Sequence, residues 1–184
     1  MLHCSTQPKI IEPKVALLAE PRWVIETLSA GHIRDSFACG RSELDEYLQR
    51  YAKQDERRDL TRVFVAVLPG QRKVAGYYTL SAGSVEHHRF PPERSRKLPH
   101  YPVPMARLRR LAVDSRQQGQ GLGSFLLLDA LKRVLAASVS LGVYGVMVDA
   151  INGQAAAFYL HFGFIRLGGD SDVWFLPLET IREL

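Results

Sequence analysis

The sequence predicts an α/β (α+β) fold, in which a mixed, twisted central sheet of about six to seven strands has helices on both faces. Three features predict this class. Residues 61–68 and 74–85 are rich in β-branched and aromatic side chains and are joined by a short polar turn, as in a hairpin. Residues 108–131 pass from an apolar strand through a glycine-rich turn into a long apolar helix. Residues 143–178 then read as strand, short helix and two further strands, so we expect a ligand site where parallel central strands part.

Size and composition indicate one globular domain. The 184-residue chain is 46% hydrophobic and 23% charged, which is typical of a globular protein. We expect residues 1–22 to form an N-terminal extension and residues 23–184 a single domain. The apolar run at 15–19 is too short for a signal sequence or a membrane span, so we expect a cytoplasmic protein with no membrane partner. Cys4 and Cys39 are too few for a disulfide framework or a zinc site, and no metal is expected.

The first part of the domain is expected to supply a strand, a helix, the hairpin and a loop. Residues 23–30 have the pattern of a short strand. Ser42 is a candidate N-cap for a helix with an acidic first turn. The apolar residues of this helix recur at helical spacing, at Leu44, Tyr47, Leu48 and Tyr51. Residues 86–104 are rich in proline, histidine and arginine, so we expect a long loop that supplies no core element.

The glycine-rich turn has the pattern of an anion-binding loop. Residues 111–113 end a strand, and Gly119, Gly121 and Gly123 allow the backbone to approach a ligand closely. The first N–H groups of the following helix, at the positive end of its dipole, would face an anion such as a diphosphate. A P-loop would need a lysine after its glycine, and the dinucleotide fingerprint has a different glycine spacing. The helix is expected to stop before Gly142 and to bury Leu127, Leu128, Leu131, Val134 and Leu135.

The C-terminal part completes the sheet. Residues 143–150 have the pattern of a buried strand. Asn152 can cap a short helix that ends near Phe162. Gly163 then turns the chain into the last strands, at 164–167 and 173–178.

Five blocks of the sequence resemble one enzyme superfamily. Arg116, Gly119 and Gly121 fit the pattern (Q/R)xxGx(G/A), which repeats from Gln118, and this resembles the acetyl-coenzyme A loop of the GNAT superfamily of N-acetyltransferases. From about Leu28 onward the chain resembles the toxin branch of that superfamily, the acetyltransferase partners of type II toxin-antitoxin modules. The other blocks are FACGRSELDEYL at 37–48, VAGYYTLSAGSV at 74–85, VDA at 148–150 and AAAFYLHFGF at 155–164.

The resemblance implies a GNAT fold, acetyl-CoA as the donor, and acetylation of the α-amino group of aminoacyl-tRNA, which halts translation. It implies that Tyr159 is the catalytic general acid, and that a ribbon-helix-helix antitoxin and a homodimer are the protein partners. The chain departs from the family pattern at Arg109, where glycine is more common. The donor-binding residues that the resemblance implies are Leu111, Ala112, Val113, Arg116, Gln118, Gly119, Gln120, Gly121, Leu122, Gly123, Ser124, Asn152 and Phe158.

The chemistry of the implied reaction is consistent with these residue types. A tyrosine with a pKa of about 10 stays protonated at neutral pH and can protonate a departing thiolate, whose reference pKa is about 8.5. An α-amine, with a pKa of about 7.7 to 8.0, is far more often unprotonated than a lysine, with a pKa of about 10.4. Since no general base stands out, the sequence favours an α-amine acceptor.

A net charge of +5 permits a polyanionic partner. The candidate RNA-binding residues are Arg50, Lys53, Arg57, Arg58, Arg62, Arg94, Arg96, Lys97, Arg109 and Arg110. Two alternatives stay open. One is a GNAT acetyltransferase that acts on a protein N-terminus or a small-molecule amine, and the other is a non-catalytic regulator that binds acetyl-CoA.

Overall fold

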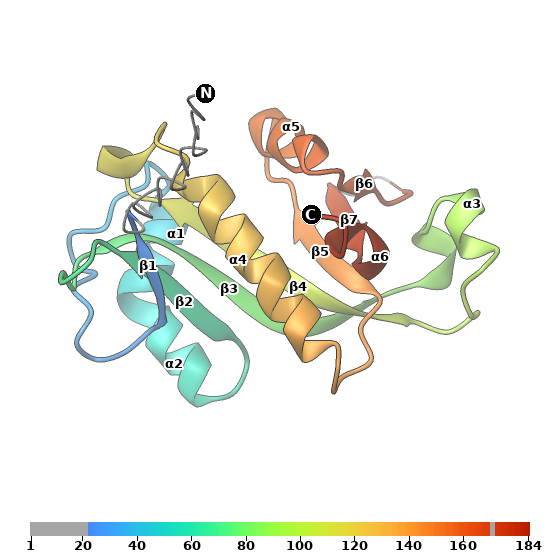
Figure 1. The fold of residues 1–184 in the computed structure, drawn as a ribbon, viewed down its shortest axis with the longest axis horizontal. Helices are drawn as coiled ribbons and strands as arrows, with labels where there is room; N and C mark the ends of the chain where they lie inside the picture. Colours follow the sequence, from blue (N-terminus) through green and yellow to red (C-terminus); the bar gives the residue numbers. More distant parts are fainter. Residues whose placement is uncertain (1–21, 170–171) are drawn as a thin grey trace, which may run out of the picture.

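The computed structural model describes residues 22–169 and 172–184. Within these residues one sheet of seven strands runs in the order β1-β2-β3-β4-β5-β7-β6 (Figure 1). The strands are β1 (Val24–Thr27), β2 (Arg62–Val67), β3 (Val74–Val85), β4 (Val103–Val113), β5 (Gly145–Asp149), β6 (Ile165–Arg166) and β7 (Val173–Pro177). The neighbours β4 and β5 are parallel, whereas the other pairs are antiparallel. The predicted mixed sheet is therefore confirmed.

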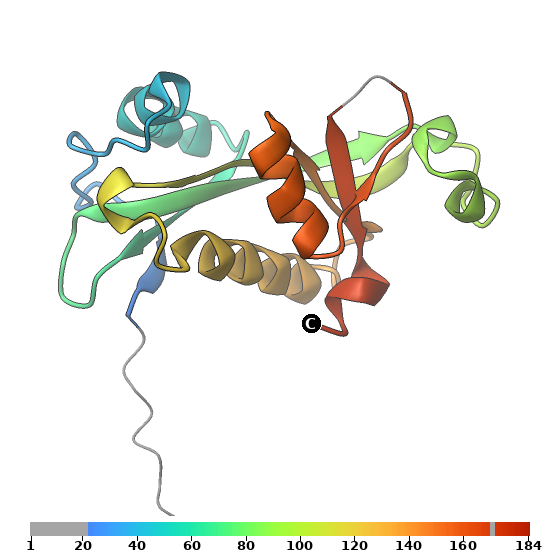
Figure 2. The same cartoon turned by 90° about the horizontal axis from the view of Figure 1, so that it is seen from above.

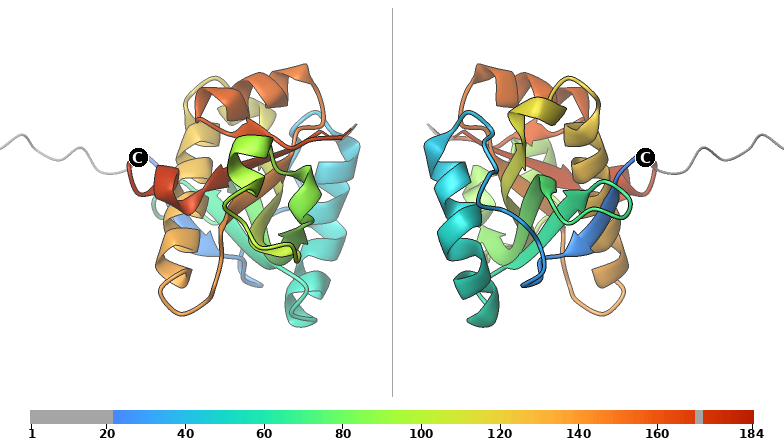
Figure 3. Two further views of the ribbon diagram at one scale, coloured as in Figure 1. Left: turned by 90° about the vertical axis from the view of Figure 1, so that its right-hand side faces the viewer. Right: turned by 90° about the vertical axis from the view of Figure 1, so that its left-hand side faces the viewer.

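Helices cover both faces of the sheet, as predicted. The helix α4 and the short α6 lie on one face, and α1, the π-helical turn η1 and α2 lie on the other (Figure 2, Figure 3). The helix α5 follows β5. Their bounds are α1 (Ser42–Glu46), η1 (Tyr47–Tyr51), α2 (Ala52–Arg57), α3 (Pro92–Ser95), α4 (Leu122–Ala137), α5 (Gly153–His161) and α6 (Leu178–Ile181), with 3₁₀ turns η2 (His87–Arg89) and η3 (Ser115–Gln117).

The main core lies between α4 and the sheet. The residues that α4 buries are Leu122, Leu126, Leu127, Ala130, Leu131 and Val134. They pack with Tyr78, Leu108 and Val146 of three adjacent strands. The prediction that Leu128 and Leu135 are also buried is wrong, since both are only partly covered. The buried stripe of α4 begins with Leu122 in its first turn, so the end of the helix that follows the glycine turn is packed against the sheet.

The second helical layer differs from its prediction because of a π-helical turn. Ser42 is not the cap: it is the first helical residue, and the preceding Arg41 makes no side-chain capping bond. The turn η1 adds one residue to the helical period. Ala52 is consequently fully buried, whereas Tyr51 is 47% exposed. Tyr47 and Leu48 are buried as expected.

The segment 86–104 does contribute to a core, so that prediction is wrong. It contains η2, α3 and the start of β4. Phe90 and Val103 are buried in a cluster that also contains Met147 and Phe175. The rings of Phe90 and Phe175 meet edge to face, with centroids 5.1 Å apart. Two isolated apolar residues in a charged segment give no periodic signal, which is why the sequence does not reveal them.

The expected N-terminal extension lies outside the described residues except for Arg22. In the part of the chain that the structure describes, no helix has the length and apolar character that crossing a bilayer requires.

Candidate active site

The two central parallel strands separate along their length. Parallel pairing between β4 and β5 extends only from Ala106 to Leu108 on β4 and from Val146 to Val148 on β5. Beyond Leu108, β4 continues to Val113 and pairs with β3 alone. One edge of β4 is therefore open over its last residues, and its backbone groups there can pair with an extended ligand.

A β-bulge at Arg109 lies where the strands part. Leu108 pairs with Leu80 and Arg110 pairs with Thr79, so Arg109 has no partner of its own on β3. The bulge fixes which backbone groups face the open edge. The N–H of Asp114 donates to the carbonyl of Ala75 on β3 at 2.8 Å. By alternation, Ala112 also directs its N–H and C=O toward β3, and Leu111 and Val113 direct theirs toward the open edge. Of the three residues predicted to contact the acetyl donor, only Leu111 and Val113 therefore have backbone groups on the open side of the strand.

The glycine-rich loop has the backbone conformation that an anion site requires. Gly119 and Gly121 have φ of +72° and +87°, and nothing lies within 4 Å of where their Cβ atoms would be. Gly121 is the N-cap of α4 and supplies no capping side chain, and the first turn holds no acidic residue. The first intrahelical bond of this turn runs from Phe125 N–H to Gly121 at 3.1 Å. The N–H groups of residues 122–124 are therefore open to an anion.

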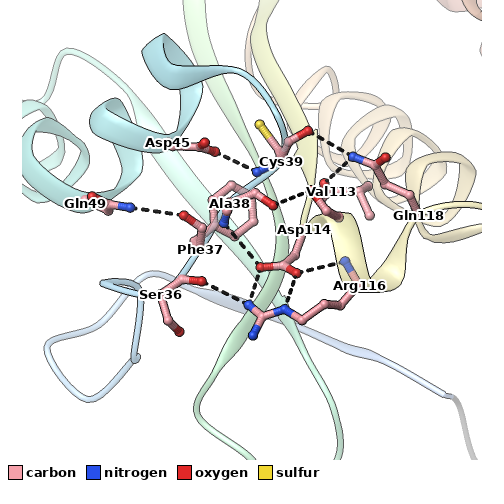
Figure 4. Close-up of polar contacts among 11 residues, drawn as sticks. Ser36, Phe37, Ala38, Cys39, Asp45, Gln49, Val113, Asp114, Arg116 and Gln118 are labelled. Carbon is pink, nitrogen blue, oxygen red and sulfur yellow. Dashed lines mark hydrogen bonds and ion pairs between the residues drawn. The ribbon is translucent and has the colours of Figure 1, made fainter.

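The polar side chains of this loop face the protein instead. Figure 4 shows Arg116 and Gln118 turned toward residues 36–39. The guanidinium of Arg116 donates to Asp114 at 2.6 and 2.7 Å and to the Ser36 carbonyl at 2.9 Å. These bonds from Arg116 hold the pKa of the Asp114 carboxyl below its ordinary value. Gln118 donates to the carbonyls of Cys39 and Val113, each at 3.0 Å.

The other residues of this loop that are predicted to contact the acetyl donor offer it few side-chain groups. Leu122 is 1% exposed and packs in the core, so only its backbone can reach a ligand. Gln120 donates to the carbonyl of Arg116 at 3.1 Å and also bonds the Arg22 side chain. Gly123 and Ser124 lie half-buried in the first turn of α4. The expected contribution of this loop is thus mainly its backbone.

Tyr159 lies near the point where the strands part. It is on α5 and is 8% exposed. Burial, followed by the negative charge of Asp149, raises the pKa of Tyr159 to about 12. Its ring contacts Phe158 and Phe164, at centroid distances of 5.4 and 5.3 Å. Among the described residues its hydroxyl has no hydrogen-bond partner, so the hydroxyl is free to donate to a ligand.

Asn152 and Phe158 hold α5 and its catalytic candidate in place. The Asn152 side chain accepts from the N–H of Ala155 at 2.8 Å, which confirms the predicted cap. Phe158 is half-buried, and its ring lies 5.2 Å from that of Phe162. Both are predicted donor contacts, and this geometry gives each of them a supporting role in α5.

Sequence reasoning missed one ion pair at the site. Arg107 on β4 binds Asp149 on β5 through contacts of 2.8, 2.9 and 3.3 Å. The pair spans the two strands next to the last parallel contact, between Leu108 and Val148. The VDA block at 148–150 contained the acidic partner, but its spacing gave no sign of an arginine some 40 residues earlier.

The predicted RNA-binding residues do not form one cluster. Those on α2 and those on α3 lie at opposite ends of the molecule (Figure 1). Arg50, Arg62 and Arg94 pair with Glu46, Asp59 and Glu179 respectively. Arg110 lies over the ring of Tyr47, 3.5 Å from its centroid, and Arg109 is exposed at the bulge. Of the predicted residues, Arg109 and Arg110 of β4 are thus nearest to the parted strands. Lys53 and Arg57 lie on α2, and Arg58, Arg96 and Lys97 follow the ends of α2 and α3.

The site belongs to an acyltransferase class of protein. Its features are the parted parallel strands, the glycine turn before a long helix, and the tyrosine on the next helix. Comparison with protein families agrees: the acetyltransferase (GNAT) domain matches residues 59–166. The chain belongs to this family.

Relatives of known name identify the branch. A tRNA-acetylating toxin of Mycobacterium tuberculosis is 43% identical over 129 residues, which are 70% of this chain and 76% of that protein. AtaT complexed with acetyl-methionyl-tRNAfMet is 32% identical with a TM-score of 0.82, over 88% of this chain and 98% of AtaT. A Tyr-to-Phe mutant of AtaT, bound to acetyl-CoA and the C-terminus of the antitoxin AtaR, is 30% identical with a TM-score of 0.77, over 89% and 98% of the two chains.

Proposed function

We propose that this protein is a toxin that transfers the acetyl group of acetyl-CoA to the α-amino group of aminoacyl-tRNA and so inhibits translation. The observation that carries the proposal is the position of Tyr159. Its free hydroxyl and the open edge of β4 lie at the same parting of strands, where the charge of Asp149 acts on the phenol. The relatedness to the mycobacterial tRNA-acetylating toxin and to AtaT supports the acceptor.

The residues of the loop fit the donor. Backbone N–H groups of residues 119–124 would hold the diphosphate, because Gly119 and Gly121 keep side chains away from it. The open N–H and C=O groups of Leu111 and the N–H of Val113 would pair with the amides of the pantetheine arm, whereas the Val113 carbonyl accepts from Gln118. Acetyl-CoA supplies an activated acyl group as a thioester.

Tyr159 acts as the general acid at the departing sulfur. A phenol with a pKa of about 12 remains protonated throughout the working pH range, which is the form that a proton donor needs. An α-amine acceptor is substantially unprotonated near neutral pH, so it can attack without a dedicated base. An N–H at the open edge of β4 would stabilise the oxyanion.

The assembly follows that of the toxin branch. An antitoxin of the ribbon-helix-helix kind would bind the toxin, and the toxin would form a homodimer in the cytoplasm. The AtaT structures with the antitoxin AtaR support an antitoxin as a partner. Arg109 and Arg110, beside the parted strands, are the first candidates for contact with the acceptor end of the RNA.

The test uses labelled acetyl-CoA and total charged tRNA. The wild-type protein should label the aminoacyl group, and Tyr159→Phe should bind acetyl-CoA normally but transfer about a hundredfold more slowly or worse. Tyr101→Phe is the matched control, because Tyr101 is 64% exposed and precedes β4, at the end of the strand opposite to its open edge. Transfer should also fall steeply when salt is raised.

Other outcomes separate the alternatives. A fully active Tyr159→Phe would remove the general-acid role. Efficient, salt-insensitive acetylation of peptides or polyamines, with charged tRNA ignored, would favour another acceptor. Binding of acetyl-CoA without transfer to any amine would leave only the non-catalytic regulator.

A further inference from the structure

Residues 36–39 form an irregular segment whose backbone is tied down on both sides; we call it the brace. Four successive carbonyls of the brace each accept a hydrogen bond. The donors are Arg116 to Ser36 at 2.9 Å, Gln49 to Phe37 at 3.0 Å, Ser115 to Ala38 at 2.7 and 2.8 Å, and Gln118 to Cys39 at 3.0 Å (Figure 4). No helix or strand is assigned to Phe37, Ala38 or Cys39. Donors from other segments therefore satisfy all four carbonyls of the brace.

The brace joins two parts of the molecule that are about 70 residues apart in sequence. On one side its donors come from the loop between β4 and α4, and the N–H of Ala38 donates back to Asp114 at 3.3 Å. On the other side the N–H of Cys39 donates to Asp45 of α1 at 2.8 Å. The ring of Phe37, 2% exposed, anchors the brace against Tyr77 of the sheet. Movement of the loop therefore has to move the start of the α1 layer as well.

Gln118 occupies the key position in this connection. Its amide nitrogen donates both to Cys39 of the brace and to Val113, the last residue of β4. Backbone groups of successive strand residues face opposite sides. Because the N–H of the next residue, Asp114, bonds to β3, the carbonyl of Val113 faces the open edge of β4. Both donor hydrogens of Gln118 are thus used within the protein, which leaves none for a phosphate.

We propose that Gln118 is a positioning residue that locks the donor-binding loop to the brace, so that donor binding and the order of α1 and η1 are coupled. The locking of the loop stands on the free protein alone. The coupling rests on the acetyl-CoA site proposed above. In physical terms, a ligand that rigidifies the loop also reduces the motion of the layer that holds Tyr47 against Arg110.

The first experiment is hydrogen exchange of the protein without any ligand. Gln118→Ala should speed exchange of the amides of Ala38 and Cys39 about tenfold, because a bond to a backbone carbonyl is lost on each side. Gln120→Ala is the matched control in this measurement, since Gln120 donates to Arg116 within the loop and does not touch the brace. Equal exchange in wild type and Gln118→Ala, or an equal effect of Gln120→Ala, would overturn the locking.

The second experiment uses the donor and a pair of variants of similar size. Gln118→Glu has acceptors only and should raise KM for acetyl-CoA about tenfold with kcat little changed. Gln118→Arg restores N–H donors and should return KM to within about threefold of wild type. In wild type, acetyl-CoA should slow exchange across residues 36–51, and in Gln118→Glu this protection should be lost. Wild-type protection in Gln118→Glu, or no rescue by Gln118→Arg, would refute the coupling.

The two proposals fail separately. If charged tRNA is not acetylated but the free-protein exchange follows the expectation, the locking by Gln118 stands and the acceptor is wrong. In that case calorimetry with acetyl-CoA replaces KM as the readout of donor binding.

Discussion

The backbone conformation of the glycine loop can be tested one residue at a time. Gly121 has a left-handed φ of +87°, with no atom within 4 Å of a built Cβ. Replacement by alanine therefore creates strain without a clash. The cost of holding a residue with a Cβ in this region is about 1 to 2 kcal/mol. Since Gly121 is also the N-cap of α4, relaxing its φ would unwind the first turn. We expect Gly121→Ala to reduce the free energy of unfolding by about 1 to 2 kcal/mol.

Two neighbouring glycines serve as comparisons for the loss of unfolding free energy in Gly121→Ala. Gly119, with φ of +72°, is not part of a helix and can relax more freely, so Gly119→Ala should cost less than Gly121→Ala. Gly123 is inside α4, where a Cβ would meet only Val113 at 3.9 Å. Gly123→Ala should therefore be neutral or should stabilise the protein by up to about 1 kcal/mol. Gly121→Asn should recover part of the loss, because asparagine tolerates this conformation.

Urea denaturation of the ligand-free variants measures these differences, and calorimetry with acetyl-CoA follows each one. Gly121→Ala should lose donor affinity as well as stability, because the strained loop is the proposed diphosphate site. If Gly121→Ala unfolds at the urea concentration of the wild type, or if Gly123→Ala loses as much stability as Gly121→Ala, the conformational argument for the loop is wrong.

Three further predictions concern other parts of the molecule. Burial, aided by Asp45, raises the pKa of the Cys39 thiol to about 11, so its thiolate is scarce at pH 8. Peptide-level mass spectrometry should show that iodoacetamide alkylates Cys39 about a hundredfold more slowly than an ordinary thiol. The rate of alkylation should increase as the pH rises, and it should be higher in Asp45→Asn. Arg107→Leu should reduce the free energy of unfolding in urea by under about 1 kcal/mol, because the ion pair with Asp149 is partly exposed. The same variant should lower kcat for charged tRNA about tenfold or more, with the affinity for acetyl-CoA unchanged. An unchanged kcat would show that the ion pair is not part of the site. Leu126→Ala should cost about 2 to 5 kcal/mol, since Leu126 is fully buried, whereas Leu160→Ala, at a 60% exposed position, should stay within about 0.5 kcal/mol of the wild type in the same assay.

Local sequence patterns were sufficient for the elements with a strong period. The strand at 74–85 has the predicted bounds, and α4 and the cap at Asn152 follow from apolar spacing and a polar start signal. Patterns failed where the period itself changes. The π-helical turn shifts the buried position from Tyr51 to Ala52, and no residue type marks such an insertion in advance.

In the site, too, the sequence predicted some features and not others. Glycines that need a positive φ are visible in the sequence, because few other residues tolerate it, and this identified the loop. The partners of long polar side chains are not visible. Arg116 and Gln118 look like phosphate ligands by spacing, yet they bond Asp114 and Val113 nearby and residues 36–39, about 80 positions earlier. Such pairings depend on how the layers pack, which local sequence does not encode.

The β-bulge explains why an arginine-rich strand can lie at the centre of this sheet. Before the bulge, Leu108 faces the core under α4. Strict alternation would place the side chain of Arg110 on that same apolar face. The extra residue, Arg109, shifts the alternation, so Leu111 and Val113 pack against the α4 core while Arg110 lies over Tyr47 of η1 on the opposite face. One inserted residue thus keeps a charge out of the main core and places it beside the parted strands, on the face where the π-helical turn begins.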